Sequence, residues 1–413
     1  MSECHSTEIA IIGAGVIGMA IAERLLRDGR EVVVIDPNPP GSGASYGNAG
    51  TIADYAVMPV GSPDVLRNLP SLLFDRNSPL AIRRAALPSL APWLLRFAAQ
   101  SLPGPTRRNA AAIAALLADA SPSWQALAER LGAQNIVQRR GCLYLYETEK
   151  AFHAAQSGLT ARQTLGIQLE LLTPADLRAL EPGLPLMPGG AAFFPNAVFL
   201  SDPAVMMAAL ARVVFGKAGL LQARADTLRR DAGSVKIMGQ GLNLLARHVI
   251  IAAGAHSREL ARQAGDRVPL ETERGYHVEW DMPTLPLTRP ACPTSRGFYL
   301  CPMQGRLRVA GTVELGGLTA PPSPHRIAKL IQGAQAIFPH LGTPSRNWMG
   351  FRPSMPDSLP VIGPSRGGAD IIHAYGHGHI GLTLAPVTAR IVADLIAGRA
   401  PELNILPYRA DRF

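Results

Sequence analysis

The sequence predicts an α/β fold of the Rossmann type that is discontinuous along the chain. Residues 8–36 read as a buried strand, a glycine-rich turn, a helix and a second buried strand. The alternation of strand and helix then stops at a loop dense in glycine, serine and asparagine, residues 37–53, and residues 60–200 are rich in proline. A helix predicted over 202–219 starts the alternation again. We therefore expect a Rossmann-like domain that is interrupted by an inserted domain.

The first strand and helix carry a G-x-G-x-x-G pattern. Residues 9–12 form the apolar run of a buried parallel strand. Gly13 permits the tight turn that follows, Gly15 lets the backbone approach a pyrophosphate, and Gly18 lets the helix pack on the strand. Phosphates are favoured where this helix begins, at Val16 and Ile17, because free N–H groups and the helix dipole attract anions.

Asp36 ends the second strand, residues 31–36, where it can accept hydrogen bonds from a ribose hydroxyl. Strand, glycines, helix, strand and acid together predict dinucleotide binding. The alternative is an ordinary βαβ unit with chance glycines. A nicotinamide-dependent enzyme would continue the alternation for about another hundred residues, and this chain does not.

Composition excludes several classes of protein. The chain has 413 residues, 47% of them apolar, which suffices for more than one domain. Its net charge of +9 is scattered without a basic stripe, which argues against nucleic-acid binding. Cys4, Cys142, Cys292 and Cys301 form no C-x-x-C pair, so we expect reduced thiols and no zinc site. The polar N-terminus lacks a signal peptide's apolar region, and four prolines in 182–201 exclude a membrane span there.

Further elements are predicted from local patterns. Asp202 and Pro203 are a helix cap and a first-turn residue for the helix over 202–219. Ala253 and Gly254 follow an apolar strand where the chain must pass close to something bulky. The other predicted elements are helices over 107–131, 149–166 and 380–397, a strand over 141–147, and a hairpin over 220–239.

Six motifs occur in a characteristic order. They are GAGVIG with Asp36, SYGNAG, HVIIAAGAHS, ERGYHVEW, GFRPSMPDSLPVIG and GHGHIGLTLAP. On these motifs the chain resembles the D-amino-acid oxidase superfamily of flavoproteins. Within it, the chain is most similar to D-amino-acid dehydrogenases, including members like D-hydroxyproline dehydrogenase, and to glycine oxidase. The resemblance covers nearly the whole chain and is weakest over 60–140.

The resemblance implies noncovalently bound FAD and an inserted antiparallel-sheet substrate domain. The FAD-binding domain would comprise 1–58, 198–270 and 345–413, and the substrate-binding domain 59–197 and 271–344. SYGNAG would lie against the flavin near N5, and Ala225 would meet the adenine. The start of the last helix would stabilise negative charge at the flavin N1 and O2, although a surface glycine loop is the alternative. The implied FAD contacts beyond the first helix are Ser45, Asn48, Ala49, Gly50, Ala225, Ala253, Gly254, Arg352, Gly378, His379, Ile380, Gly381, Leu382 and Thr383.

The candidates for substrate binding also rest partly on the resemblance. Arginine suits an amino-acid carboxylate because two N–H groups match two oxygens. Arg352 is the first candidate for substrate or flavin contact, with a structural salt bridge as the alternative. Arg306 and Arg308 share one face of a predicted strand, and one of them is a second candidate. The resemblance adds Tyr276, His277, Tyr299 and His379, with Tyr276 and His277 on opposite faces of a strand.

These residues predict FAD-dependent oxidation of a D-amino acid or a cyclic imino acid such as a D-hydroxyproline. Hydride would pass from Cα to flavin N5, and electrons to a quinone or dye-type acceptor. The alternatives are an oxidase that uses O₂ and an FAD-bearing subunit of a heteromeric complex, and a homo- or hetero-oligomer stays open. We expect a cytoplasmic protein. Residues 80–99 are either a lipid-facing patch at the inner face of the cell membrane or a helix pair within the substrate domain.

Overall fold

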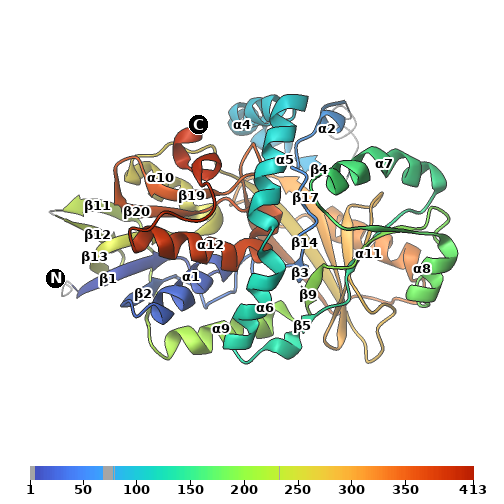
Figure 1. Cartoon of the computed structure of the whole chain (residues 1–413), viewed down its shortest axis with the longest axis horizontal. Coiled ribbons are helices and arrows are strands. Elements are labelled where there is room, and N and C mark those ends of the chain that lie inside the picture. The colour runs from blue at the N-terminus through green and yellow to red at the C-terminus, as the bar shows by residue number, and fades with distance from the viewer. Residues whose placement is uncertain (1–4, 68–77, 79, 232) are drawn as a thin grey trace.

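The structure of the chain is a computed structural model that describes residues 5–67, 78, 80–231 and 233–413. Cys4 lies outside the described residues, and so do residues 68–77, which the sequence analysis assigned to the substrate-binding domain. The chain folds into two halves, each built around a large sheet (Figure 1).

An eight-stranded sheet forms the core of the first half. Its strands β10, β2, β1 and β13 are parallel neighbours in that order. Along its other edge, the first part of β13 pairs with β12 of the antiparallel hairpin β11–β12. The last part of β13 pairs in parallel with β20, which in turn pairs with β19. The bounds are β1 His5–Ile12, β2 Val32–Ile35, β10 Gly219–Leu221, β11 Thr227–Asp231, β12 Ser234–Gly239, β13 Leu242–Ile251, β19 Val361–Ser365 and β20 Gly368–Tyr375. The discontinuous Rossmann-like fold is thereby confirmed.

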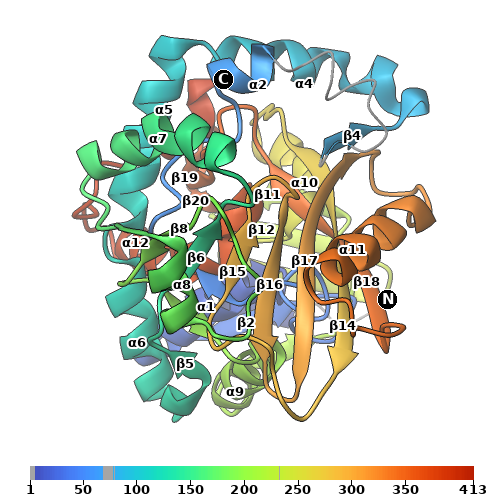
Figure 2. The ribbon, with the colours of Figure 1, turned by 90° about the vertical axis from the view of Figure 1, so that its right-hand side faces the viewer.

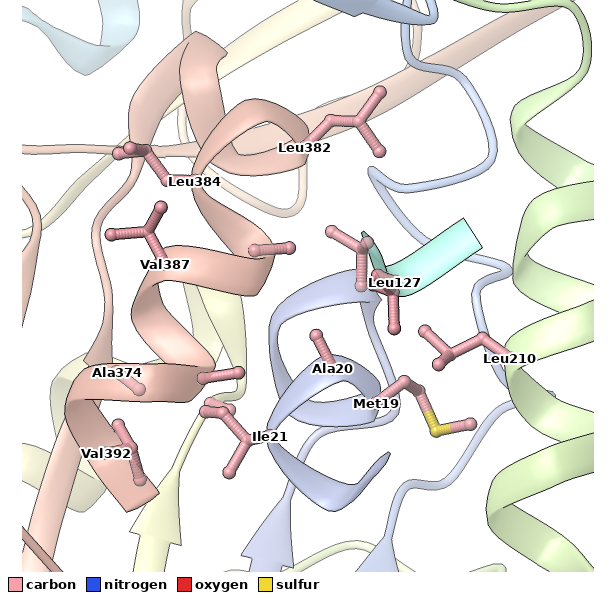
Figure 3. Packing of buried hydrophobic residues seen from close by; sticks show 14 of the residues in the cluster. Met19, Ala20, Ile21, Leu127, Leu210, Ala374, Leu382, Leu384, Val387 and Val392 are labelled. Atoms are coloured by element: carbon pink, nitrogen blue, oxygen red, sulfur yellow. The ribbon is translucent and has the colours of Figure 1, made fainter. Parts of the chain in front are cut away.

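Helices from distant parts of the chain cover this sheet. They are α1 (Val16–Arg27), α9 (Pro203–Phe215), α10 (Ser257–Ala264) and α12 (Gly381–Ile396). Figure 3 shows Ile21 of α1, Leu210 of α9 and Val387 of α12 in one apolar cluster. Asp202 caps α9 as predicted, because its Oδ1 accepts from Ala204 N at 2.9 Å.

The predicted helix over 107–131 is two helices, α5 (Pro103–Leu117) and α6 (Ala120–Arg130). Pro122 lacks an N–H group and clashes with the preceding turn, so one continuous helix is disfavoured. Both helices pack on α12 of the first half, and the Trp124 indole donates to the Leu382 carbonyl at 2.8 Å. The predicted domain boundary assigned them to the substrate domain.

A nine-stranded sheet forms the second half. Its order is β18-β14-β17-β16-β15-β6-β8-β7, with β4 also paired to β17. Neighbours are antiparallel except β15–β6 and β17–β4. Helix α11 (Pro324–Ile337) covers one face, as Figure 2 shows. The strand bounds are β4 Leu80–Ile82, β6 Cys142–Leu145, β7 Glu170–Leu172, β8 Ala191–Phe194, β14 Glu271–Asp281, β15 Ala291–Pro293, β16 Phe298–Met303, β17 Arg306–Leu315 and β18 Arg346–Ser354.

A small sheet connects the two halves. It consists of β3 (Thr51–Ile52), β9 (Val198–Leu200) and β5 (Val137–Gln138), all antiparallel. The remaining helices are α2 (Pro63–Arg67), α4 (Leu87–Gln100), α7 (Glu149–Thr164) and α8 (Pro174–Leu180).

Residues 80–99 form strand β4 and helix α4 rather than a helix pair. Trp93 and Phe97 stack with ring centroids 5.2 Å apart and are buried against Leu315, so the aromatic side chains face inward. Within the described residues, the segment Gly378–Ile396 is long and apolar enough to cross a membrane, but 67% of its most apolar window is buried in the protein. Core helices of globular proteins have the same properties.

Candidate functional site

The glycines of the first turn fall into two classes. A Cβ atom on Gly13, whose φ is +116°, would lie 2.3 Å from the Ala252 carbonyl oxygen. One on Gly18 would lie 1.9 Å from the Gly13 carbonyl oxygen. A Cβ atom on Gly15 would instead have only the Ser45 hydroxyl nearby, at 3.5 Å. Gly13 and Gly18 are therefore required for packing, whereas Gly15 faces open space.

Side chains fix the shape of this turn. The Val16 N–H donates to Ser45 Oγ at 2.9 Å, which places the predicted flavin loop at the start of α1. Asp36 Oδ2 accepts from Ala14 N at 2.8 Å, and its Oδ1 accepts from Asn38 N at 2.9 Å. Ala225 follows strand β10, which pairs with β2. Since Asp36 directly follows β2, both residues come after the carboxyl ends of neighbouring strands.

The start of α12 meets the same region. Gly378 has a φ of +54°, and a Cβ atom there would have only Ser354 Oγ within 4 Å, at 3.9 Å. The Thr383 hydroxyl accepts from Ala53 N at 3.0 Å. Because Ser45 contacts α1 and Ala53 contacts α12, residues 45–53 connect the beginnings of the two helices.

The residues present fit an extended FAD. Gly254 has a φ of +54° and no atom within 4 Å of an added Cβ. Gly15, Gly254 and Gly378 thus all have open space beside them, and each follows the carboxyl end of one of three neighbouring strands. A cofactor can approach the protein backbone closely at these positions. The predicted contacts come together here from segments 13–18, 45–50, 253–254 and 378–383.

Arg352 on β18 faces the same region from the second sheet. Its guanidinium crosses the neighbouring strand β14 at Gly275, where a Cβ atom would lie 2.3 Å from Arg352 Cζ. Arg352 Nη1 donates to the Thr312 carbonyl at 3.0 Å. Burial lowers the pKa of Arg352, and the opposite carboxylate of Glu273 partly counters this. The side chain is therefore a cation in a low-polarity interior.

The two histidines before α12 have different surroundings. His377 is buried, and its Nε2 lies 3.0 Å from the Thr388 hydroxyl inside α12. The side chain of His379 is exposed and borders a pocket that Glu273 and Ser354 also line. Burial, together with Arg352, lowers the pKa of His379 to about 4. His379 is therefore neutral at physiological pH.

Tyr299 belongs to a cluster of phenols on the side of the second sheet that faces away from α11. Its hydroxyl lies 3.3 Å from Tyr55 Oη and 3.4 Å from Tyr144 Oη, and Tyr55 Oη lies 3.0 Å from Cys142 Sγ. Burial raises the pKa of all three phenols, which stay neutral donors. Tyr55 and Tyr144 were missed by sequence reasoning. Only the alternation of Cys142 and Tyr144 along β6 could have indicated their shared face.

Tyr276 and His277 point to opposite faces of β14, as the alternation predicts. Tyr276 is buried against α11, where its hydroxyl donates to Glu314 at 2.6 Å and accepts from Ser323 N at 3.1 Å. This placement corrects the expectation that Tyr276 is a catalytic candidate, because the sheet separates it from the glycines. His277 faces the flavin loop and stacks on Trp348 with ring centroids 5.2 Å apart.

Arg306 and Arg308 share one face of β17, as predicted, but both bind Glu279. Arg306 Nε lies 3.0 Å and Arg308 Nε 2.7 Å from its Oε1. Arg308 is 0% exposed. It therefore has no free surface for a substrate carboxylate, which leaves that candidate role to Arg352.

Comparisons of sequence identify the family of this chain. The DAO family profile, described as FAD dependent oxidoreductase, matches residues 8–395. D-amino-acid oxidase of Bradyrhizobium diazoefficiens is 35% identical over 416 residues, which cover 98% of each protein. D-amino acid dehydrogenase 2 of Ralstonia nicotianae is 29% identical over 436 residues. The matched region covers 98% of this chain and 100% of the dehydrogenase.

Solved structures share the fold. Glycine oxidase from Geobacillus kaustophilus superimposes with a TM-score of 0.79 at 24% identity, covering 99% of both chains. L-proline dehydrogenase from P. horikoshii has a TM-score of 0.77 at 20% identity, covering 100% of this chain and 98% of that one. The family match extends over nearly the whole chain. The chain therefore belongs to the DAO family of FAD dependent oxidoreductases, and FAD is its cofactor.

Proposed function

We propose that this protein oxidises a D-amino acid or a cyclic imino acid, such as a D-hydroxyproline, at Cα, and passes the electrons to a quinone or dye-type acceptor. FAD supplies the redox chemistry, because its ring system can accept the hydride that leaves Cα. The protein supplies binding, orientation and exclusion of water.

The observation that carries the proposal is Arg352. Its guanidinium lies across Gly275 in the interior, next to His379 at the start of α12. A planar cation in a low-polarity site binds a carboxylate through two parallel hydrogen bonds. This arrangement would orient the Cα–H bond of an amino acid relative to the flavin.

The neighbouring groups suit a neutral amine. Hydride leaves an amine-bearing carbon only when the nitrogen has a free electron pair, so the substrate ammonium must lose its proton first. His379 is uncharged above about pH 4, and a neutral imidazole can accept a hydrogen bond from the amine without repelling it. The phenols of Tyr55, Tyr144 and Tyr299 add neutral hydroxyls to the same side of the second sheet.

Anaerobic addition of amino acids to the purified holoenzyme tests the proposal. We expect the flavin absorption to bleach with at least one D-amino acid or cyclic imino acid, and to stay unchanged with the opposite enantiomer at equal concentration. If no member of a broad panel of amino acids, imino acids and other amines reduces the flavin, the proposal is wrong.

The second candidate function is an oxidase that uses O₂. It is favoured by the 35% identity to a D-amino-acid oxidase over 98% of both chains. Turnover in air with measurement of H₂O₂, with and without a quinone analogue or dye, separates the two. Stoichiometric peroxide without an added acceptor would identify the oxidase, and turnover only with the acceptor would identify the dehydrogenase.

A further inference from the structure

Three successive carbonyl groups of the SYGNAG loop, residues 45–50, are bound by side chains of the second sheet. Arg308 Nη1 donates to the carbonyl oxygens of Tyr46 at 3.0 Å and Asn48 at 2.6 Å. The Gly47 carbonyl between them lies 3.2 Å from His277 Nδ1. A carbonyl oxygen can only accept, so His277 carries its proton on Nδ1 here. All three carbonyls therefore point toward strands β14 and β17.

The amide groups of the same peptides must point the opposite way. In a trans peptide the C=O of one residue and the N–H of the next are antiparallel. The N–H groups of Gly47, Asn48 and Ala49 are thus directed away from the sheet. Within the part of the chain that the structure describes, none of these three N–H groups donates to a protein atom. Residues 47–49 are half-buried, so these N–H groups form a row of donors that is open to a ligand or to water.

This row belongs to the segment that connects the two helix starts. Ser45 contacts the first turn of α1, and Ala53 contacts Thr383 of α12. The Gly47 Cα is pressed against Trp348, because an added Cβ atom would lie 2.0 Å from the indole ring. The sheet side of the loop is therefore closed, and the N–H groups are directed away from that side.

Arg308 is itself held rigidly. It is 0% exposed, and its Nε donates to Glu279, which is 1% exposed, at 2.7 Å. Glu279 also binds Arg306 at 3.0 Å and Arg346 at 3.0 Å. Burial alone would raise the pKa of Glu279, but Arg308 and Arg306 lower it to about 2, so the carboxylate stays charged. A buried guanidinium in such a network cannot rotate without leaving a charge unpaired.

We propose that Arg308, fixed by Glu279, is a positioning residue that sets the peptide planes of residues 46–48 and thereby aims the amide N–H groups of residues 47–49 at the flavin ring. The proposal rests on the flavin-binding role of the SYGNAG loop in the proposed function. It means that the inserted sheet, and not only the Rossmann-like half, determines the hydrogen bonding of the cofactor.

A pair of matched variants tests this role. R308Q and R346Q each remove one arginine from Glu279. Of these two arginines, Arg308 donates to the carbonyls of residues 46 and 48, whereas Arg346 is 48% exposed and pairs with Glu279 and Asp281. FAD affinity is measured by fluorescence titration of the apoprotein, and the absorption spectrum and reduction potential are measured on the reconstituted protein. We expect R308Q to raise the FAD Kd about tenfold or more and to shift the flavin bands, because charge-assisted bonds to two carbonyls are lost. R346Q should stay within about twofold of wild type.

R308K separates positioning from charge. Lysine keeps the charge but cannot donate in the fork geometry that reaches two carbonyls and Glu279 together. We expect R308K to raise the FAD Kd and shift the spectrum in the same direction as R308Q. The proposal is overturned if R308Q matches R346Q in Kd, spectrum and potential. If R308Q does not fold, wild-type values for R308K overturn it. A failure of the proposed activity would appear separately, as a wild-type flavin that no amino acid reduces.

Discussion

Arg352 shows how two residues on adjacent strands build one binding group. Its guanidinium occupies the space that a side chain at position 275 would fill, so the proposed site needs Gly275 as well as the arginine. The Thr312 carbonyl holds one end of the guanidinium, and the carboxylate of Glu273 lies opposite it on the neighbouring strand. A surface arginine would have no such fixed orientation.

Replacing Arg352 should therefore impair substrate binding more than folding. We expect R352Q to raise the substrate concentration needed for half-maximal anaerobic flavin reduction by roughly 10- to 150-fold, since hydrogen bonds between charged groups contribute about 1.5–3 kcal/mol. Stopped-flow reduction across a substrate series measures this. R352K should recover only part of the loss. An unchanged half-saturation value in R352Q would exclude the carboxylate role.

At the scale of elements, the two helices α1 and α12 begin at the same cleft although they lie at opposite ends of the chain. Each start is preceded by glycines, and the loop of residues 45–53 touches both. The glycines have separate purposes. Gly18 lets α1 pack against the preceding turn, whereas Gly15 leaves room for a ligand.

These purposes predict different outcomes for G15A and G18A. We expect G18A to lower the thermal stability of the apoprotein, because its Cβ would lie 1.9 Å from a backbone oxygen. G15A should fold like wild type and bind FAD at least about tenfold more weakly, since its methyl group fills the phosphate cradle. Differential scanning fluorimetry of apoprotein and FAD titration measure both.

G158A is the control for a glycine-to-alanine change. Gly158 lies in helix α7, where an added Cβ would meet only Arg162 Nη1, at an ordinary contact distance of 3.5 Å. That change should leave FAD affinity unaltered and stabilise the protein slightly, by about 0.4–1 kcal/mol. A G15A protein that binds FAD like wild type would contradict the assignment of Gly15 to the phosphates.

At the scale of the whole molecule, the site lies where the two halves meet. Loop 46–48 of the first half is hydrogen-bonded to β14 and β17 of the second. FAD contacts would add to this interface, because the cleft draws on segments from the whole length of the chain. Cofactor binding and the association of the halves are therefore linked.

This linkage predicts that FAD stabilises the entire protein. A ligand present at 100 times its Kd stabilises the native state by about 2.7 kcal/mol. We expect the melting temperature of apoprotein to rise progressively with added FAD in one cooperative transition. Calorimetry at several FAD concentrations measures it, with riboflavin as the control that lacks the pyrophosphate and adenine. Two transitions, only one of which responds to FAD, would show that the halves are independent.

Two histidines in the interior predict how stability depends on pH. Burial lowers the pKa of His277 to about 4 and that of His377 to about 3, from an ordinary value of 6.5. Between pH 6.5 and 4 the unfolded chain binds protons at these positions and the folded apoprotein does not. The free energy of unfolding therefore falls as the pH decreases through this window.

Urea denaturation of apoprotein at several pH values checks this dependence. H377N should flatten the slope by about one proton, because one of the two buried imidazoles is removed. H153Q is the control for the loss of an imidazole from the surface, since His153 is exposed on α7. A stability that is constant from pH 6.5 to 4 would show that the histidines are accessible to protons in the folded state.

Local patterns predicted much of the first half of the molecule. The glycines, Asp36, the Asp202 cap and the interruption of the Rossmann-like fold are each encoded within a few residues, by backbone sterics and the period of apolar side chains. Prediction failed where the outcome depends on contacts distant in sequence. Nothing near Tyr276 or Arg308 indicates that one packs against α11 and the other against loop 46–48, and Tyr55 and Tyr144 belong to no motif.

The sequence by itself determined that this chain binds a dinucleotide in an interrupted Rossmann-like domain, because turn geometry and a phosphate site need only neighbouring residues. The resemblance of six motifs to a flavoprotein family identified that dinucleotide as FAD. Tertiary structure decided which charged and aromatic side chains face the cleft. The guanidinium of Arg352 can cross strand β14 because the residue there is Gly275. The guanidinium of Arg308 is held instead by Glu279 and by the carbonyls of residues 46 and 48. Strand pairing and register select these partners, and they arise only when segments far apart in the chain meet.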